Sequence, residues 1–322
     1  MTRCSAIVLL FGTSLLAQQP GSAPADVKPS ASKQPSVVDQ RTRLNVAMGV
    51  PSDAAIDAND HEKFLIVRRQ WVASYSDKKR TVNWMSWHIN QQSLPKEHHY
   101  RRQEFFSPDP LLPKSFTRVE HFDYHRDNGF DRGHMTPAAD RSLSDEDNRT
   151  TFMTSNIVPQ APNNNQLAWE RFERHCRELA KRHEIFIVAG PHGRGGEGQF
   201  GYRTEIGRAH VQVPSHTWKV VLALPPGKTS PKDVTNTTTV VAIVTPNNQS
   251  VTEDWRKYEV SVAEVERLTG YKFFSKVDPT IATALKNAGP KRKVEPSVPI
   301  GKADELAKRK KPAKELKGGL DK

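Results

Sequence analysis

The sequence contains only two cysteines among its 322 residues, which leaves almost no scope for a disulfide framework. Cys4 lies in an apolar N-terminal stretch, so a chain cleaved after that stretch would keep Cys176 alone. A chain of this length can bury enough apolar surface to fold without disulfides. Beyond the N-terminus, no segment reaches the roughly 18 consecutive apolar residues of a membrane-spanning helix. There is also no internal repeat. These absences argue against a disulfide scaffold, stable membrane insertion and a solenoid.

Positive charge is in excess, with 48 Lys and Arg against 36 Asp and Glu, which gives a net charge of +12. Residues 290–322 hold 11 basic and five acidic side chains, so this tail alone carries +6 and the other 289 residues carry the remaining +6. An excess of this sign favours an anionic partner such as nucleic acid or an anionic surface. Solubility alone is the competing explanation, because the charge outside the tail is modest.

Composition divides the chain into four parts. Residues 1–17 have a basic start at Arg3, an uncharged apolar stretch and small residues at its end, which is typical of an export signal. A buried N-terminal helix is the alternative. Residues 18–40 are rich in Pro, Ser, Ala and Gln, as in a flexible linker. We therefore expect a secreted or periplasmic protein with a folded domain over residues 41–289 and a disordered basic tail over residues 290–322.

Alternation of apolar and polar residues predicts mostly strands, with few helices between them. The expected strands are Phe64–Val67, Gln70–Tyr75, Thr81–Ile89, Glu184–Ala189, His210–Val213, Trp218–Leu224 and Thr237–Val244. Helical spacing appears in residues 166–183, and a second helix is indicated between a capping Ser261 and a closing Gly270. Glycine-rich residues 190–198 predict a flexible loop between strands. Because strands and helices do not alternate, we expect an α+β fold with a largely antiparallel sheet.

The most informative motif is the run from Asp131 through Arg132 and Gly133 to His134. An arginine can hold a phosphate oxygen with a planar fork of donors. A histidine can accept a proton near neutral pH. A hydrolase of phosphodiesters needs both functions. Asp131 carries a carboxylate, for which we expect an orienting role rather than a role as metal ligand.

A second cluster follows downstream, where Asn165, Glu173 and Arg177 are separated by eight and four residues. Steps close to two turns and one turn place all three side chains on one helical face. Helix capping by one of the asparagines and an ordinary solvated surface are competing explanations. Mg²⁺ keeps several of its waters, so a site with one amide oxygen as protein ligand is chemically reasonable.

Taken together, the motifs resemble those of the DNA/RNA nonspecific endonuclease family, which includes secreted bacterial nucleases and mitochondrial endonuclease G. The resemblance covers most of the chain from Phe64 to Phe274. Its motifs are Trp84-x-x-Trp87-His88, Phe106-Ser107-Pro108-Asp109-Pro110, Asp123-Tyr124, Asp131 to His134, Glu146-Asp147-Asn148, Asn156 to Gln160, Asn165-Gln166-x-x-Trp169 and Val265-Glu266-x-x-Thr269-Gly270. Several separated motifs in one order are more specific than any single motif.

This resemblance implies a ββα-metal (His-Me finger) nuclease fold with a central sheet flanked by helices. It implies that His134 is the general base, that Asn165 is the direct ligand of one Mg²⁺, with Mn²⁺ as a possible substitute, and that Glu173 holds a water of that ion. The implied phosphate contacts are Arg132, Arg177 and Arg102. The implied partners are DNA and RNA, cut with little sequence preference to give 5′-phosphate products.

One departure from the family concerns loop geometry, because Asp127-Asn128 stands where the family has Gly-Ser. Two other functions remain open at this stage. One is a phosphodiesterase of the same fold that acts on small nucleotides. The other is a non-catalytic protein that binds nucleic acid through its basic tail. The sequence indicates neither a preference between DNA and RNA nor an oligomeric state.

Overall fold

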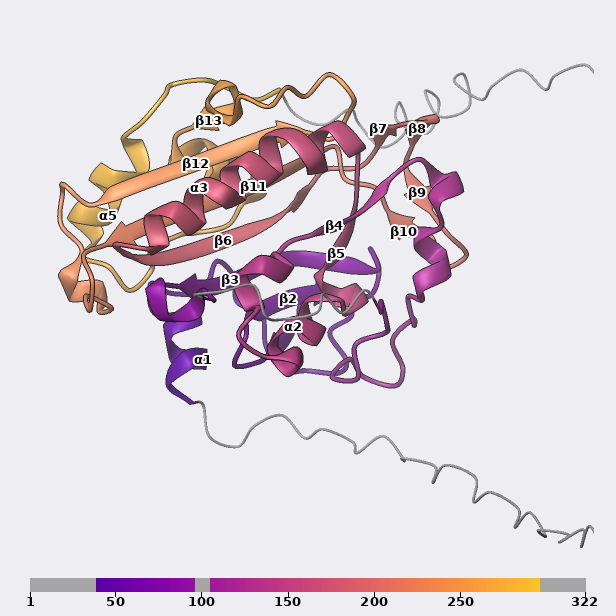
Figure 1. The fold of residues 1–322 in the computed structure, drawn as a ribbon, viewed down its shortest axis with the longest axis horizontal. Coiled ribbons are helices and arrows are strands. Elements are labelled where there is room, and N and C mark those ends of the chain that lie inside the picture. Colours follow the sequence, from indigo (N-terminus) through magenta and orange to yellow (C-terminus); the bar gives the residue numbers. More distant parts are fainter. Residues whose placement is uncertain (1–38, 96–104, 296–322) are drawn as a thin grey trace, which may run out of the picture. The chain divides into compact units, whose positions relative to one another are not determined.

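A computed structural model describes residues 39–95 and 105–295, so Arg102 lies outside the described residues. Its centre is a seven-stranded sheet in which every neighbouring pair is antiparallel (Figure 1). In spatial order the strands are β1 (Phe64–Val67), β2 (Val72–Ser76), β3 (Thr81–Ile89), β6 (Glu184–His192), β11 (His216–Leu224), β12 (Thr239–Pro246) and β13 (Glu259–Val260). The α+β fold with an antiparallel sheet is confirmed.

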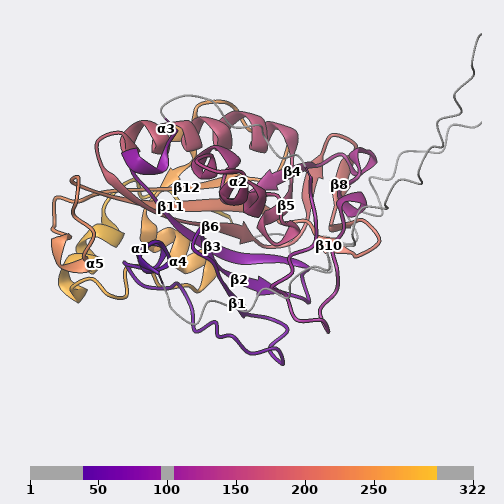
Figure 2. The same cartoon turned by 60° about the horizontal axis from the view of Figure 1, so that its bottom comes forward.

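Helices cover both faces of this sheet (Figure 2). The helix α3 (Glu170–Ala180) packs on one face, where its Phe172 joins a cluster that contains Trp87 of β3. The helices α4 (Val262–Thr269) and α5 (Pro279–Asn287) pack on the other face, where Val265 joins a cluster that contains Trp84. Because alternate residues of a strand point to opposite faces, β3 supplies one tryptophan to one core and one to the other.

The tryptophans in and beside the first strands belong to the core. Trp71, Trp84 and Trp87 are all fully buried. The indole nitrogen of Trp84 donates to Ser52 Oγ at 2.9 Å, and that of Trp87 donates to Asp140 Oδ2 at 2.9 Å. None of the three rings is available to stack on a nucleobase.

Most expected elements are present, but residues 190–198 differ from expectation. They were expected to form a flexible loop, whereas Gly190 and the two residues after it extend β6, and Gly196–Gly198 forms β7, which pairs with β8 (Gly201–Arg203). A Cβ on Gly190 would lie 2.5 Å from the backbone oxygen of Asn83 and 2.8 Å from the ring of Trp218. This glycine therefore makes room for a neighbouring indole inside a strand rather than giving the chain freedom.

The remaining elements are small and lie outside the central sheet. The expected strand at residues 210–213 is β10 (Val211–Gln212), which pairs with β9 (Glu205–Ile206). Two short helices, α1 (Gln40–Asn45) and α2 (Asp145–Thr151), lack the apolar periodicity that would have indicated them. Among the described residues, no helix has the length and apolar character needed to cross a bilayer.

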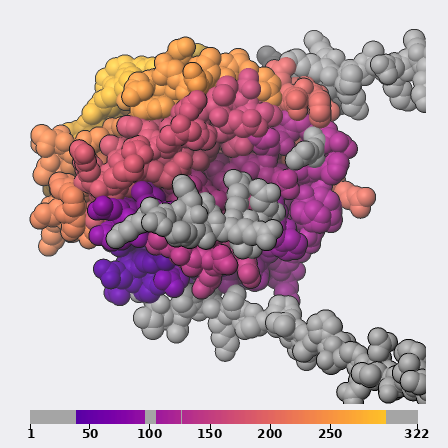
Figure 3. Space-filling view, in the orientation of Figure 1, coloured from indigo at the N-terminus to yellow at the C-terminus, as the bar shows by residue number. Residues whose placement is uncertain are grey.

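A separate antiparallel pair of strands, the β4–β5 hairpin, carries the principal sequence motif. It consists of β4 (Asp131–His134) and β5 (Ile157–Gln160), which pair with each other in a two-stranded sheet. The hydroxyl of Thr81 on β3 donates to the backbone oxygen of Ile157 at 3.3 Å, which ties the hairpin to the central sheet. The chain then enters α3, whose outer side lies on the molecular surface in the space-filling view (Figure 3). The hairpin and helix together form a ββα unit.

Candidate active site

The hairpin register explains why the motif contains glycine. Gly133 lies opposite Val158, two positions away from the pair formed by Asp131 and Gln160. A Cβ on Gly133 would lie 2.2 Å from Gln160 Oε1 and 2.6 Å from Gln160 Cβ. Only glycine therefore allows the buried side chain of Gln160 to cross the strand. Strand alternation places Asp131 and Gly133 on one side, and Arg132 and His134 on the other.

His134 is held by its backbone and by aromatic neighbours. The two residues that follow it are fixed by Asn156, whose backbone and side-chain oxygens accept their N–H groups at 3.0 and 2.8 Å. The backbone oxygen of His134 accepts the indole N–H of Trp169 at 3.3 Å. Its ring packs edge-on against Phe152, with centroids 5.0 Å apart, and lies 5.8 Å from Phe106. The imidazole is thus held on a rigid, partly buried support.

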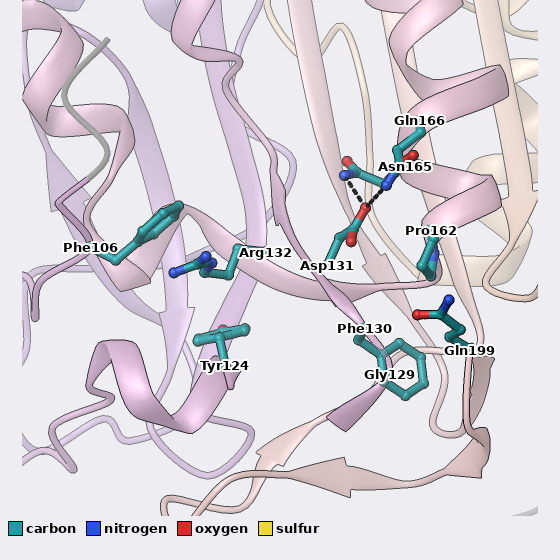
Figure 4. A pocket seen from close by; sticks show the side chains of 10 residues that line it. All are labelled: Phe106, Tyr124, Gly129, Phe130, Asp131, Arg132, Pro162, Asn165, Gln166 and Gln199. Carbon is teal, nitrogen blue, oxygen red and sulfur yellow. Dashed lines mark hydrogen bonds between the residues drawn. The ribbon is translucent and has the colours of Figure 1, made fainter. Parts of the chain in front are cut away.

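Asp131 links the hairpin to the helix (Figure 4). The side-chain nitrogens of Asn165 and Gln166 both donate to Asp131 Oδ2, each at 2.8 Å. An ionised carboxylate can only accept hydrogen bonds, so the amide of Asn165 must direct its nitrogen to Asp131 and its oxygen away. The expected orienting role of Asp131 therefore has a geometric basis.

A cavity of about 420 Å³ lies beside this contact. It is lined by Phe106, Tyr124, Gly129, Phe130, Asp131, Arg132, Pro162, Asn165, Gln166 and Gln199. Arg132 projects away from Asp131 and stacks on Phe106, with its guanidinium carbon 4.4 Å from the ring centroid (Figure 4). Gln199, in the turn between β7 and β8, donates its backbone N–H to Gly129 at 2.7 Å. The cavity thus brings together a fixed amide and a guanidinium from the two sequence motifs.

The helix that carries Asn165 begins as a π-helix over Asn164–Trp169 and continues as α3. Such wide turns are rare and occur often at functional sites. The three successive asparagines have different contacts. Asn163 stands at the helix start but caps nothing with its side chain, which donates to the backbone oxygen of Gln249 at 2.7 Å. Asn164 is buried and donates to Thr217 Oγ1 on β11 at 3.0 Å, which leaves Asn165 to face the cavity.

Glu173 and Arg177 lie further along the helix and do not line the cavity. They are not a solvated face either, because their side chains are only 12% and 19% exposed. Arg177 pairs with Asp140 at 3.2 Å, and Glu173 Oε1 lies 3.4 Å from the ammonium of Lys219. Burial raises the pKa of Glu173 to about 7, against the opposing effect of the Lys219 and Arg177 charges.

Comparison with known proteins places this geometry in a family. The family model described as DNA/RNA non-specific endonuclease matches residues 56–280. The chain belongs to this family. A nuclease of Nostoc sp. is 37% identical over 282 residues, which are 87% of this chain and 94% of the relative. The mouse mitochondrial nuclease EXOG is 36% identical over 212 residues, which are 64% of this chain and 55% of the relative.

Among solved structures, the fold resembles that of EndoG in a complex with EndoGI, a structure that concerns EndoG inhibition. The sequences are 26% identical, the TM-score is 0.61, and the match covers 75% of this chain and 94% of the other. The protein is therefore a hydrolase of the non-specific DNA/RNA endonuclease type. Because the protein is a hydrolase, the non-catalytic binding function that the sequence left open is excluded.

Several residues of this endonuclease were not anticipated from the sequence. Lys219 could have been noticed as a lone charge in an otherwise apolar strand. Asp140, which accepts hydrogen bonds from both Trp87 and Arg177, gives no signal in the sequence. Cys176, in contrast, has no reactive character, because it is buried and burial raises the pKa of its thiol to about 12.

Gly133→Ala should destabilise the endonuclease, because the new methyl group must displace the buried Gln160 side chain. Overpacking of this kind costs about 1–3 kcal/mol in the free energy of unfolding, which urea denaturation followed by circular dichroism can measure. Gln160→Gly in the same chain should recover part of the loss, since it removes the obstructing atoms. Equal destabilisation with and without Gln160→Gly would contradict the steric explanation.

Proposed function

We propose that this endonuclease hydrolyses the phosphodiester bonds of both DNA and RNA with His134 as general base and one Mg²⁺ held by Asn165. The observation that carries this proposal is the pair of hydrogen bonds that Asp131 accepts from Asn165 and Gln166. They direct the side-chain oxygen of Asn165 away from Asp131, in a cavity that Arg132 also lines. His134 lies on the same four-residue strand. The cavity therefore has a phosphate clamp and an oriented oxygen donor within one ββα unit, with the proposed base on the strand that supplies the clamp.

The residues that line the cavity suit Mg²⁺, which needs few protein ligands, better than a metal ion that is held entirely by protein side chains. In the part of the chain that the structure describes, no group of three His, Cys, Asp or Glu side chains could hold a metal ion. The oriented amide of Asn165 offers one hard oxygen, which suits an ion that keeps most of its waters. Mn²⁺ shares this preference for oxygen and is a possible substitute. When bound, Mg²⁺ would neutralise charge on the phosphate and on the leaving 3′ oxygen.

The other side chains would have separate roles around the phosphate. His134 would take a proton from the attacking water, and the guanidinium of Arg132 would neutralise the phosphate oxygens. Glu173 would hold a water of the hydrated ion. Arg177 would act at longer range, because Asp140 holds it outside the cavity lining. Cleavage at the 3′ oxygen leaves a 5′ phosphate on the product.

His134→Ala should lower kcat on plasmid DNA and on RNA by about 10²–10⁴-fold, the usual contribution of a general base. The measurement is digestion at saturating Mg²⁺, with EDTA as the second condition. His210→Ala is the matched control, because His210 is 62% exposed and pairs with Glu205 away from the cavity lining. Undiminished cutting by His134→Ala would refute the assignment, and cutting that persists in EDTA would refute the metal requirement.

Asp131→Asn should raise the Mg²⁺ concentration for half-maximal rate by about 10- to 100-fold, the usual effect of losing an orienting partner of a metal ligand. Asp131 Oδ2 can only accept hydrogen bonds, whereas the new amide can turn either its oxygen or its nitrogen toward Asn165, so the Asn165 amide loses its fixed orientation. Asp127→Asn is the control, since Asp127 is 86% exposed and lies outside the cavity lining. An unchanged Mg²⁺ requirement in Asp131→Asn would show that this contact does not orient a ligand.

We also propose that the endonuclease is exported, on the basis of the charge and apolar pattern of residues 1–17. Expression of the full sequence in a Gram-negative host should place cleaved protein in the periplasm or the medium, with an N-terminus near residue 18. Deletion of residues 2–17 should retain the activity in the cytoplasm. The measurement is N-terminal sequencing of each fraction, and an uncleaved cytoplasmic chain from the full sequence would overturn the proposal.

A further inference from the structure

Lys219 is a charged side chain in the middle of the central sheet. It lies on β11, between Ala189 of β6 and Ile243 of β12, and is only 1% exposed. Its neighbours on the strand, Trp218 and Val220, belong to the core on the opposite face. The Lys219 side chain therefore points toward α3. A lysine is almost never buried to this extent unless it is paired, because removing an ammonium from water is costly.

The ammonium is held by one carboxylate and two indoles. Its Nζ lies 3.4 Å from Glu173 Oε1, 4.1 Å from the centroid of Trp169 and 5.5 Å from that of Trp87. Cations are attracted to the faces of indole rings, and more strongly when both are shielded from water. Trp169 also donates to the backbone of His134. A single buried charge thus contacts Glu173 on α3 and the ring that supports the proposed base.

Few other charges lie near Glu173. The guanidinium of Arg177 comes from the same helix, the carboxylate of Asp140 comes from the 3₁₀ turn Ala138–Arg141, and the thiol of Cys176 remains neutral. Arg177 is already paired with Asp140. Lys219 is therefore the cation that pairs with Glu173.

We propose that Lys219 is a positioning residue, which fixes the Glu173 carboxylate beneath the active site and keeps it ionised in the pH range where the enzyme works. Lys219 does not line the cavity, so it would act through Glu173. This inference rests on the proposed function in one respect, the role of Glu173 as an anion during cleavage. Its electrostatic part concerns the folded protein alone and can be tested without cleavage.

Electrostatics sets the direction of the effect. The pKa of Glu173 is raised to about 7 by burial even with Lys219 in place. A carboxyl group whose pKa is raised in the folded state gives its full stability below its ordinary pKa and loses it as pH rises through the raised value. Lys219→Met removes the stabilising cation while keeping a similar length. The pKa of Glu173 should then rise further, and the loss of stability should extend to higher pH.

The experiment compares Lys219→Met, Glu173→Gln and the double variant by urea unfolding in EDTA from pH 5 to pH 9. The pH dependence attributable to Glu173 is the difference between each chain and its Glu173→Gln counterpart. Lys219→Met should shift the midpoint of this difference upward by about one pH unit or more, as expected when an opposite charge nearby is lost. Lys181→Met is the control, because Lys181 is an exposed lysine at the end of the same helix, paired with Glu178.

Cleavage gives a second measurement. With saturating Mg²⁺, the acidic limb of the pH–kcat profile should move upward by a similar amount in Lys219→Met, and kcat should recover in part at higher pH, with little change in KM for plasmid. An unshifted difference curve would overturn the positioning role even if kcat fell. If the wild type shows no His134-dependent cleavage, the proposed function fails, while the unfolding result still decides the role of Lys219.

The double variant keeps the test decisive if Lys219→Met does not fold. Methionine and glutamine are both neutral, so this chain has neither a buried ammonium nor a buried carboxylate that needs one. Folding of the double variant but not of Lys219→Met would support the proposed pairing. Failure of both would overturn it, because the lysine would then be needed for a reason other than Glu173.

Discussion

The hydrogen bonds that Asp131 accepts from Asn165 and Gln166 join residues 34 and 35 positions apart, and the geometry of the candidate active site depends on them. Neither segment alone makes a site. The hairpin offers an arginine and a histidine, and the helix offers an amide whose two ends differ in chemistry. Because a carboxylate accepts and never donates, the contact selects one of the two amide orientations. Asp131 therefore determines which end of the Asn165 amide is directed away from the hairpin.

A second constraint is the free-energy cost of burying charged side chains next to the candidate site. Glu173, Arg177, Asp140 and Lys219 are all largely withdrawn from water, and each is paired. Breaking such a pair leaves an uncompensated charge, which typically costs several kcal/mol. The pairs are also tied to the tryptophans of the core, since Trp87 donates to Asp140 and Trp169 lies over the ammonium. The hydrophobic core beneath α3 and these buried ion pairs are thus in direct contact.

The sequence predicted the antiparallel sheet and picked out both motifs because these have local signals, whereas the ββα unit was implied by the resemblance to a family. Periodicity indicated the strands, and helical spacing placed Glu173 and Arg177 on one side of α3. What could not be predicted depends on packing between distant segments. The contacts of Asn163 and Asn164 go to Gln249 and Thr217, which no local pattern anticipates. Gly190 suggested a loop because the indole that requires it lies on another strand.

The π-helix over Asn164–Trp169 determines how far α3 is rotated about the helix axis relative to Asn165. Each residue of an α-helix advances the chain by about 100°, and each residue of the wider π turns advances it by less. Rewinding this segment as an α-helix with the same number of residues would therefore rotate α3 relative to Asn165. Either the amide would leave Asp131, or Glu173 would leave Lys219. The wide turns therefore let one continuous helix direct an amide to the hairpin and a carboxylate to the sheet.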